Sequence, residues 1–331
     1  MRLNPFRLGG VAIALASLAF SLLPSTVASA TATVPTVPAA RSFFPWLPPG
    51  GGNPWNPWLP PGGGQPGNPP GGGQPGQFPD GFPQGFQVPV SNETGRPVGG
   101  WGCDSTGRTD GGAVKHIPVL FVHGATRDAH DWDQVRQYYL DHGYSLCETW
   151  AVSYGYNSTQ QVDTNAASAP TVQAFVAHML TYLQQSKNAQ VTQVDVVTHS
   201  LGGTVVRTWL KDSGEYDRVH SFVEIAGPNH GLDICPGGPA ETCRELTPGD
   251  QWLNDLNGND ETPGQIRYMT IYDGTGQYDM FYKGNLIDSP ALQGATNHPY
   301  NREHGTRLDH VGLINGTADL QLSWLKDEHA G

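Results

Sequence analysis

The serine of the stretch "VVTHSLGG", residues 196–203, lies in surroundings that favour nucleophilic chemistry. Ser200 follows an apolar run rich in valine and precedes two glycines that open a helical pattern. A G-x-S-x-G turn between a strand and a helix exposes the serine oxygen above the sheet. Thr198 replaces the first glycine, a modest departure because a small side chain still fits there. The alternative is a buried serine that caps the helix, but the position of the turn favours a nucleophile.

A nucleophilic serine also requires hydrogen-bond donors for the oxyanion that its attack produces. The backbone N–H of Leu201, directly after the serine, is the first candidate. The segment "VHGATRD", residues 122–128, follows an apolar run and contains a glycine for a tight turn, so the N–H of Ala125 is the second candidate. We interpret His123 in this segment as a structural residue rather than a proton carrier.

The general base for such a serine is a histidine held by a carboxylate, in the chain order Ser, Asp, His. His310 precedes an apolar segment in "RLDHVGLI", whereas the other late histidines lie in polar sequence or at the terminus. Two acids, Asp273 and Asp279, follow the apolar run at 266–272. Spacing alone does not separate these two carboxylates.

Short apolar runs alternate with helical patterns along the part of the chain that contains these residues. Helical spacing of apolar residues is evident over 132–139 and 172–183, and again over 202–211. Such alternation predicts parallel βαβ crossovers in one sheet, with the working residues in loops beyond the carboxyl ends of the strands. The predicted strands are 117–122, 147–152, 193–198, 218–227 and 266–272.

The first thirty residues have the pattern of a secretory signal peptide. Arg2 and Arg7 provide a basic start, an apolar core covers 11–23, and a small-residue cleavage pattern occupies 28–30. A membrane anchor would need a longer apolar run. We therefore expect a secreted, extracellular protein.

Residues 31–100 are predicted to be a disordered tether, and residues 101–331 a catalytic domain. The segment 45–90 is low in complexity and repeats "WLPPGGG", a composition that buries too little apolar surface to fold. Its tryptophans raise the hypothesis of adsorption to a surface, although we favour a linker with incidental aromatic residues.

The formal net charge of −12, without any cluster of Lys and Arg, argues against a nucleic-acid partner. The four cysteines of an exported chain predict two disulfides. Cys235 and Cys243 enclose a short Pro- and Gly-rich segment and are expected to pair, which leaves Cys103 for Cys147. The cysteine and histidine spacings do not match those of a metal site.

At these residues the chain resembles the secreted bacterial lipases of the lipase class 2 group, which are α/β-hydrolases. The shared blocks include "PVLFVHG", "VVTHSLGG", "IAGPNHG" and "DHVGLI". The resemblance implies an α/β-hydrolase fold, His310 as the base and Asp279, in "YDM", as the acid. It also implies that His230 is structural. The insertion at 232–264, braced by the Cys235–Cys243 bridge, is then expected to wall or cover the cleft.

These observations predict a lipase or esterase that cleaves carboxylic ester bonds of lipids through an acyl-enzyme on Ser200, without a metal or organic cofactor. One alternative is an extracellular polyester depolymerase. Another, of a different class, is a non-catalytic binding protein with the same fold. The expected partner is a lipid or polyester substrate, with an interface as one place of encounter. We expect a monomer without a stable protein partner.

Overall fold

The computed structural model describes residues 80–92, 94–125, 127–155, 164–232, 234–235 and 241–326. The predicted signal peptide and residues 31–79 of the predicted tether lie outside these ranges. Within them, no helix combines the length and the apolar character that a membrane span requires.

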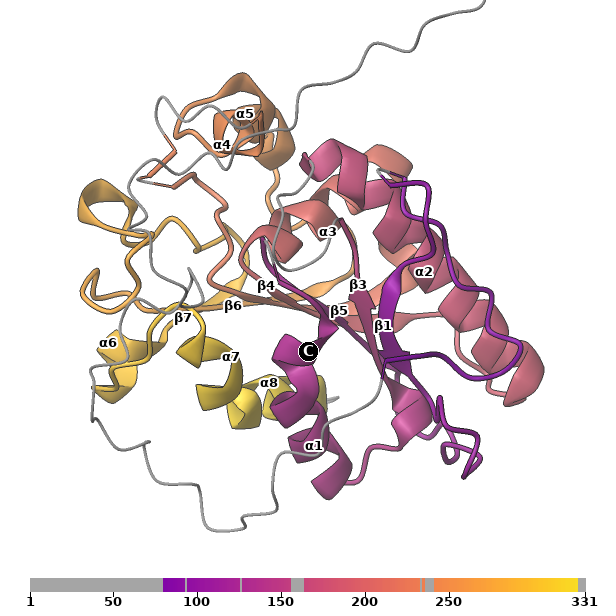
Figure 1. The fold of residues 1–331 in the computed structure, drawn as a ribbon. Coiled ribbons are helices and arrows are strands. Elements are labelled where there is room, and N and C mark those ends of the chain that lie inside the picture. Colours follow the sequence, from indigo (N-terminus) through magenta and orange to yellow (C-terminus); the bar gives the residue numbers. More distant parts are fainter. Residues whose placement is uncertain are drawn as a thin grey trace, which may run out of the picture. The chain divides into compact units, whose positions relative to one another are not determined.

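The described residues form a central sheet of seven strands in the order β1-β3-β2-β4-β5-β6-β7 (Figure 1). Only the pairing of β1 with β3 is antiparallel; the other neighbouring pairs are parallel. The strands are β1 (Gly99–Gly102), β2 (Val119–Val122), β3 (Thr149–Ser153), β4 (Val194–His199), β5 (Val219–Ile225), β6 (Arg267–Tyr272) and β7 (Thr296–Pro299).

The five strands expected from the apolar runs are confirmed as β2 to β6. Their side chains are almost all buried, because helices cover both faces of the sheet. The two edge strands were not predicted. β1 has the sequence GGWG and β7 the sequence TNHP, and neither contains an apolar run. Hydrogen bonding to a neighbouring strand, rather than local propensity, defines these edges.

Helices form a layer on each face of the sheet. Figure 1 shows α2 and α3 on one face and α1, α7 and α8 on the other. Alternate side chains of one strand reach opposite layers: Leu120 joins the core under α2 and α3, and Phe121 the core under α1. The α-helices are α1 (Asp133–Asp141), α2 (Asn165–Ser186), α3 (Leu201–Ser213), α4 (Glu241–Glu245), α5 (Gln251–Asn257), α6 (Tyr300–His304), α7 (Gly312–Gly316) and α8 (Ala318–Lys326). The 3₁₀ helices are η1 (Ala129–Trp132), η2 (Leu146–Glu148), η3 (Tyr216–Arg218) and η4 (Gly284–Leu286).

Residues 81–92 and 94–98 pack against this framework, which corrects the carboxyl end of the predicted tether. The Phe86 ring lies 5.1 Å from the ring of Trp150 on β3 and 5.5 Å from that of Phe175 on α2, measured between centroids. Phe82 also contacts Phe175, at 5.5 Å. The Pro- and Gly-rich composition continues to about residue 90. The sequence therefore did not indicate that Phe82 and Phe86 belong to the core, and only their contacts show it.

Both predicted disulfides are present. Cys103 bonds to Cys147 and thereby ties the end of β1 to η2, which leads into β3. Cys235 bonds to Cys243 at the start of the insertion. The insertion contains the short helices α4 and α5, although its sequence shows little periodicity. Its role as a cover of the cleft stays a prediction.

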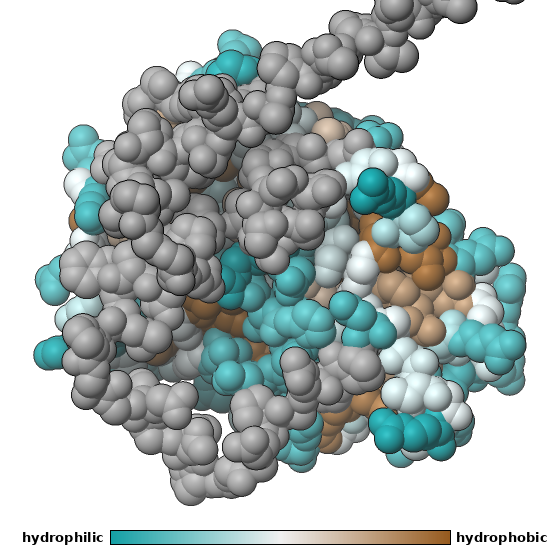
Figure 2. All heavy atoms as spheres, in the orientation of Figure 1, coloured by the Kyte–Doolittle hydropathy of each residue, from teal (hydrophilic) through white to brown (hydrophobic). Residues whose placement is uncertain are grey.

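The described surface mixes hydrophilic side chains with smaller hydrophobic areas on the face that Figure 2 shows. Among the described residues, the large hydrophobic side chains that are clearly exposed are Val90, Ile234 and Met280. Met280 directly follows Asp279 in the chain.

Candidate active site

Ser200 occupies a tight turn between the carboxyl end of β4 and the first residue of α3. Its φ of +53° and ψ of −127° are rare for a residue with a side chain, and such backbone strain concentrates at functional sites. The N–H of Ser200 donates to the carbonyl of Ile225 on β5, at 2.8 Å. This geometry is the one expected of the strand-turn-helix motif.

Close packing around the turn explains which residues the sequence places there. A Cβ on Gly202 would come within 2.6 Å of the carbonyl oxygens of Val122 and His123, so only glycine allows α3 to approach β2. Thr198 is fully buried, and its hydroxyl lies 3.5 Å from the carbonyl oxygen of Val223. Threonine is therefore compatible with the turn in place of the usual glycine.

His310 and Asp279 form a hydrogen-bonded pair from two separate loops. The Nδ1–H of His310 donates to Asp279 Oδ2 at 2.7 Å. Asp279 is fully buried, and its Oδ1 accepts the N–H of Phe281 at 3.0 Å. A buried carboxylate that accepts from Nδ1 holds the imidazole in the tautomer that leaves Nε2 free to accept a proton.

His310 is anchored beside the nucleophile through the residue that precedes the serine. The Nε2–H of His199 donates to the backbone carbonyl of His310 at 2.9 Å. Burial lowers the pKa of His199 well below its usual value, so this imidazole is neutral. The ring of Phe281 packs edge-on against that of His310, at 4.5 Å between centroids. The three predicted residues thus lie in segments that follow the carboxyl ends of β4, β6 and β7.

Asp273, the alternative acid, directs its carboxylate toward its own loop and toward α6. It accepts hydrogen bonds from the backbone of residues 277–279 and from the side chains of Thr275 and Asn301. Burial alone would raise the pKa of Asp273, but these hydrogen bonds outweigh burial and lower it. The geometry therefore favours Asp279 as the partner of His310.

The loop that carries Ala125 lies against the elbow. A Cβ on Gly124 would come within 2.9 Å of the Cβ of Ser200, so the glycine allows the loop to approach. His123 stabilises this loop: its Nδ1–H donates to the carbonyl of Gly124 at 2.7 Å, and its Nε2 accepts the N–H of Tyr154 at 3.2 Å. These contacts agree with a structural role for His123. The N–H groups of Ala125 and Leu201 remain the predicted oxyanion donors.

Sequence reasoning did not identify His199, Asn301 or Glu224 as contributors to this region. Glu224, on β5, is buried against Gly203 at the start of α3. The position of His199 directly before the nucleophile was a signal that could have identified it. Nothing in the sequence around Asn301 relates this residue to the loop 28 residues upstream that contains Asp273. His230, expected to be structural, faces an acceptor at each ring nitrogen: Nδ1–H donates to the carbonyl of Ser289 and Nε2–H to the carboxylate of Glu261, both at 3.0 Å.

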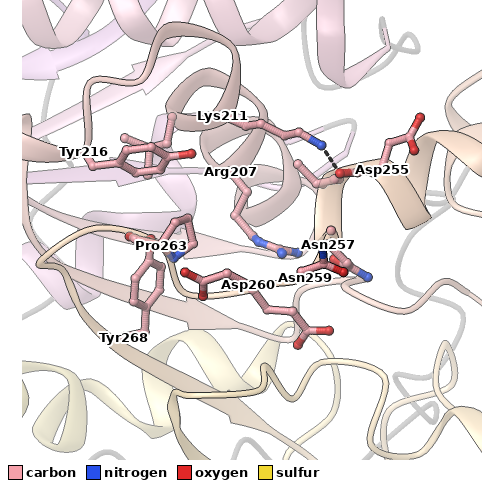
Figure 3. A pocket seen from close by; sticks show the side chains of 13 residues that line it. Arg207, Lys211, Tyr216, Asp255, Asn257, Asn259, Asp260, Pro263 and Tyr268 are labelled. Atoms are coloured by element: carbon pink, nitrogen blue, oxygen red, sulfur yellow. Dashed lines mark hydrogen bonds between the residues drawn. The ribbon is translucent and has the colours of Figure 1, made fainter.

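A separate pocket lies between α3, α5 and the start of β6 (Figure 3). It has a volume of about 250 Å³, and Lys211 on its rim donates to the backbone carbonyl of Asp255. None of the three candidate catalytic residues lines it.

A second hollow, of about 300 Å³, borders the loop after β2 at Arg127 and Asp128. In the described ranges, no group of three or more His, Cys, Asp or Glu is arranged to hold a metal ion.

The mostly parallel sheet, the serine turn after β4 and the loops that follow β6 and β7 define an α/β-hydrolase. The model of the lipase (class 2) family matches residues 116–322, and the chain belongs to this family.

Solved structures that are similar to this chain include those of lipases, at low sequence identity. The propeptide form of Bacillus licheniformis lipase BlEst2 superposes with a TM-score of 0.50 and 16% identity, over 65% of this chain and 52% of that one. The mature form of that lipase gives a TM-score of 0.48 at 16% identity, over 65% and 96% of the two chains. Aspergillus fumigatus lipase B gives 0.47 at 15% identity, over 72% and 53%. The chain thus spans about half the length of the propeptide form.

Proposed function

We propose that the protein is a secreted serine hydrolase that cleaves the ester bonds of acylglycerols, with Ser200, His310 and Asp279 as the catalytic residues. The observation that carries the proposal is the hydrogen bond between buried Asp279 and His310, anchored by His199 next to the strained Ser200. Membership of the lipase (class 2) family supports the substrate class. The two disulfides are compatible with an oxidising, extracellular location.

The reaction is acyl transfer to water in two steps. His310 Nε2 takes the proton of the Ser200 hydroxyl as its oxygen attacks the ester carbonyl, and the N–H groups of Leu201 and Ala125 stabilise the oxyanion. His310 then protonates the departing alcohol, which leaves an acyl-serine. A water molecule, deprotonated by His310, hydrolyses this ester, while Asp279 stabilises the imidazolium in both steps. We propose that a monomer carries out this cycle without a cofactor.

The test is a series of p-nitrophenyl esters of increasing chain length, a triolein emulsion and a polyester film, with wild type and Ser200→Ala. We expect wild type to hydrolyse the esters and triolein, and Ser200→Ala to lose at least about 10⁴-fold in kcat. A fluorophosphonate probe should label wild type and leave folded Ser200→Ala unlabelled. Hydrolysis of the film in preference to triolein would reassign the substrate to polyesters. Failure of folded wild type to react with any ester or the probe would contradict a serine hydrolase.

A further inference from the structure

Asp273 connects the two loops that carry the candidate acid and base. Its Oδ2 faces the loop after β6, where it accepts the N–H groups of Gln277, Tyr278 and Asp279 at 3.2, 3.2 and 3.3 Å. The last of these donors is the backbone of the candidate acid itself. Asp273 is 2% exposed, so water does not replace these bonds readily.

The other oxygen of Asp273 faces the loop that leads to the candidate base. Oδ1 accepts the side-chain N–H of Asn301 on α6 at 2.7 Å, in addition to the hydroxyl of Thr275 at 2.6 Å. Asn301 is itself buried and makes two hydrogen bonds with the backbone of Leu308, to the carbonyl at 2.8 Å and from the N–H at 3.0 Å. Its Oδ1 also accepts the Thr306 hydroxyl at 2.6 Å. The segment 306–308, immediately before His310, is thus held from the same carboxylate.

We propose that Asp273 is a positioning residue that sets the distance between Asp279 and His310 through one carboxylate shared by their two loops. The proposal rests on the function proposed above. The loops also meet at the reacting side chains and through Arg302, whose backbone N–H and Nη1–H donate to the carbonyls of Asp273 and Gly274 at 3.3 and 3.0 Å. A shift of about 1 Å between the reacting side chains can cost on the order of 10² in rate. A carboxylate suits this role because all five groups that hydrogen-bond to it are donors: the side chains of Thr275 and Asn301 and the backbone N–H groups of residues 277–279. In Asp273→Asn the amide NH₂ would replace one acceptor oxygen and would face donors.

The experiment measures kcat and KM of Asp273→Asn for a short p-nitrophenyl ester, alone and combined with Asp279→Asn. In the wild-type background we expect kcat to fall about 10- to 100-fold and KM to change by less than about threefold. In the Asp279→Asn background the further loss should be less than about threefold, because the pair that Asp273 aligns is already broken.

Asp195→Asn is the matched control. Asp195 is also buried and accepts a hydrogen bond from His220 at 2.9 Å, but it lies at the start of β4, about 16 Å along the strand from Ser200. This variant should lose thermal stability and retain wild-type kcat. If Asp273→Asn does not fold, Asn301→Ala replaces it, because this variant removes only the hydrogen bonds between Asp273 and the segment before His310. It should also lower kcat and leave KM nearly unchanged.

The positioning role would be overturned by an unchanged kcat in Asp273→Asn, or by an equal fold-loss in the wild-type and Asp279→Asn backgrounds. A similar loss of kcat in Asp195→Asn would also overturn it, because general destabilisation would then suffice. These results differ from a failure of the proposed function. In that case wild type itself would not hydrolyse the ester, and the fluorophosphonate probe would not label Ser200.

Discussion

The backbone of Ser200 stores strain that the surrounding contacts hold in place. A residue with a side chain at φ near +53° is typically destabilised by about 1–3 kcal/mol, and this state persists only where neighbours determine it. Here the N–H of Ser200 is bonded to Ile225 on β5, and its carbonyl accepts the N–H of Gly203 at 3.0 Å. The strain is the consequence of presenting a side chain outward at the point where strand becomes helix.

This strain predicts an unusual order of stability among inactive variants. The free energy of unfolding of Ser200→Gly should be about 1 kcal/mol higher than that of Ser200→Ala, so the glycine variant should be the more stable. The reason is that glycine adopts positive φ without a steric penalty. At Ser213, the last residue of α3, alanine should be the more stable of the two replacements. Urea denaturation of the four variants measures both differences. The same preference for alanine at both positions would contradict strain at Ser200.

At the scale of elements, the segment before β1 acts as part of the hydrophobic core rather than as a linker. Phe86 is 8% exposed and packs with Phe82 against β3 and α2. The segment is also joined to the framework by hydrogen bonds, from Asn92 N–H to the Thr171 hydroxyl at 3.0 Å and between His178 Nδ1 and the carbonyl of Gln87 at 2.7 Å. It therefore covers α2 where the layer would otherwise expose aromatic side chains.

Truncation should reveal this contribution. A chain that begins at residue 80 should match the full chain in free energy of unfolding, and one that begins at residue 99, which keeps β1, should lose roughly 3 kcal/mol or more. Phe86→Ala in the longer chain should account for much of that loss, about 3 kcal/mol. Thermal and urea denaturation provide the measurement. Equal stability of the two truncated chains would restore the boundary predicted at residue 101.

At the scale of the whole molecule, a buried group of charged and polar residues lies inside the fold beside the start of α3. Burial raises the pKa of Glu224 to about 7, and the nearby guanidinium of Arg207 opposes that rise. Arg207 donates to Asn229 Oδ1 at 2.8 Å, and Asn229 in turn donates to Glu224 Oε2 at 2.9 Å. In the described part of the chain, Glu224 Oε1 has no hydrogen-bond partner. The carboxylate is therefore poorly stabilised once it ionises.

This group predicts a pH dependence of stability. Because the pKa of Glu224 in the folded protein exceeds the ordinary value of 4.5, the folded state binds a proton more tightly than the unfolded state, and stability falls as the pH rises from about 4.5 to 7. Between pH 4.5 and 8, wild type should lose about 2–3 kcal/mol relative to Glu224→Gln. Urea denaturation across this range measures the difference, with pH 4.5 as the reference where both side chains are neutral in the folded protein. A pH-independent difference would contradict the assignment.

The sequence by itself determined those features that depend on neighbours along the chain. The apolar runs located β2 to β6, the helical spacing located α2 and α3, and the place of Ser200 between strand and helix identified the candidate nucleophile. The short separation of Cys235 and Cys243 was enough to pair all four cysteines. Local periodicity carries this information, because a buried strand and an amphipathic helix each leave a regular pattern of apolar residues.

Only the tertiary structure decided the features that depend on contacts between distant segments. Spacing did not separate Asp273 from Asp279, and only the family resemblance favoured Asp279. The approach of the loops containing Asn301 and His310 shows which carboxylate contacts the predicted base and which one bridges the two loops. The edge strands and the packing of Phe86 likewise depend on partners about 27 to 90 residues away in the chain. Such contacts have no periodic signature, because each is one side chain meeting one other across the fold.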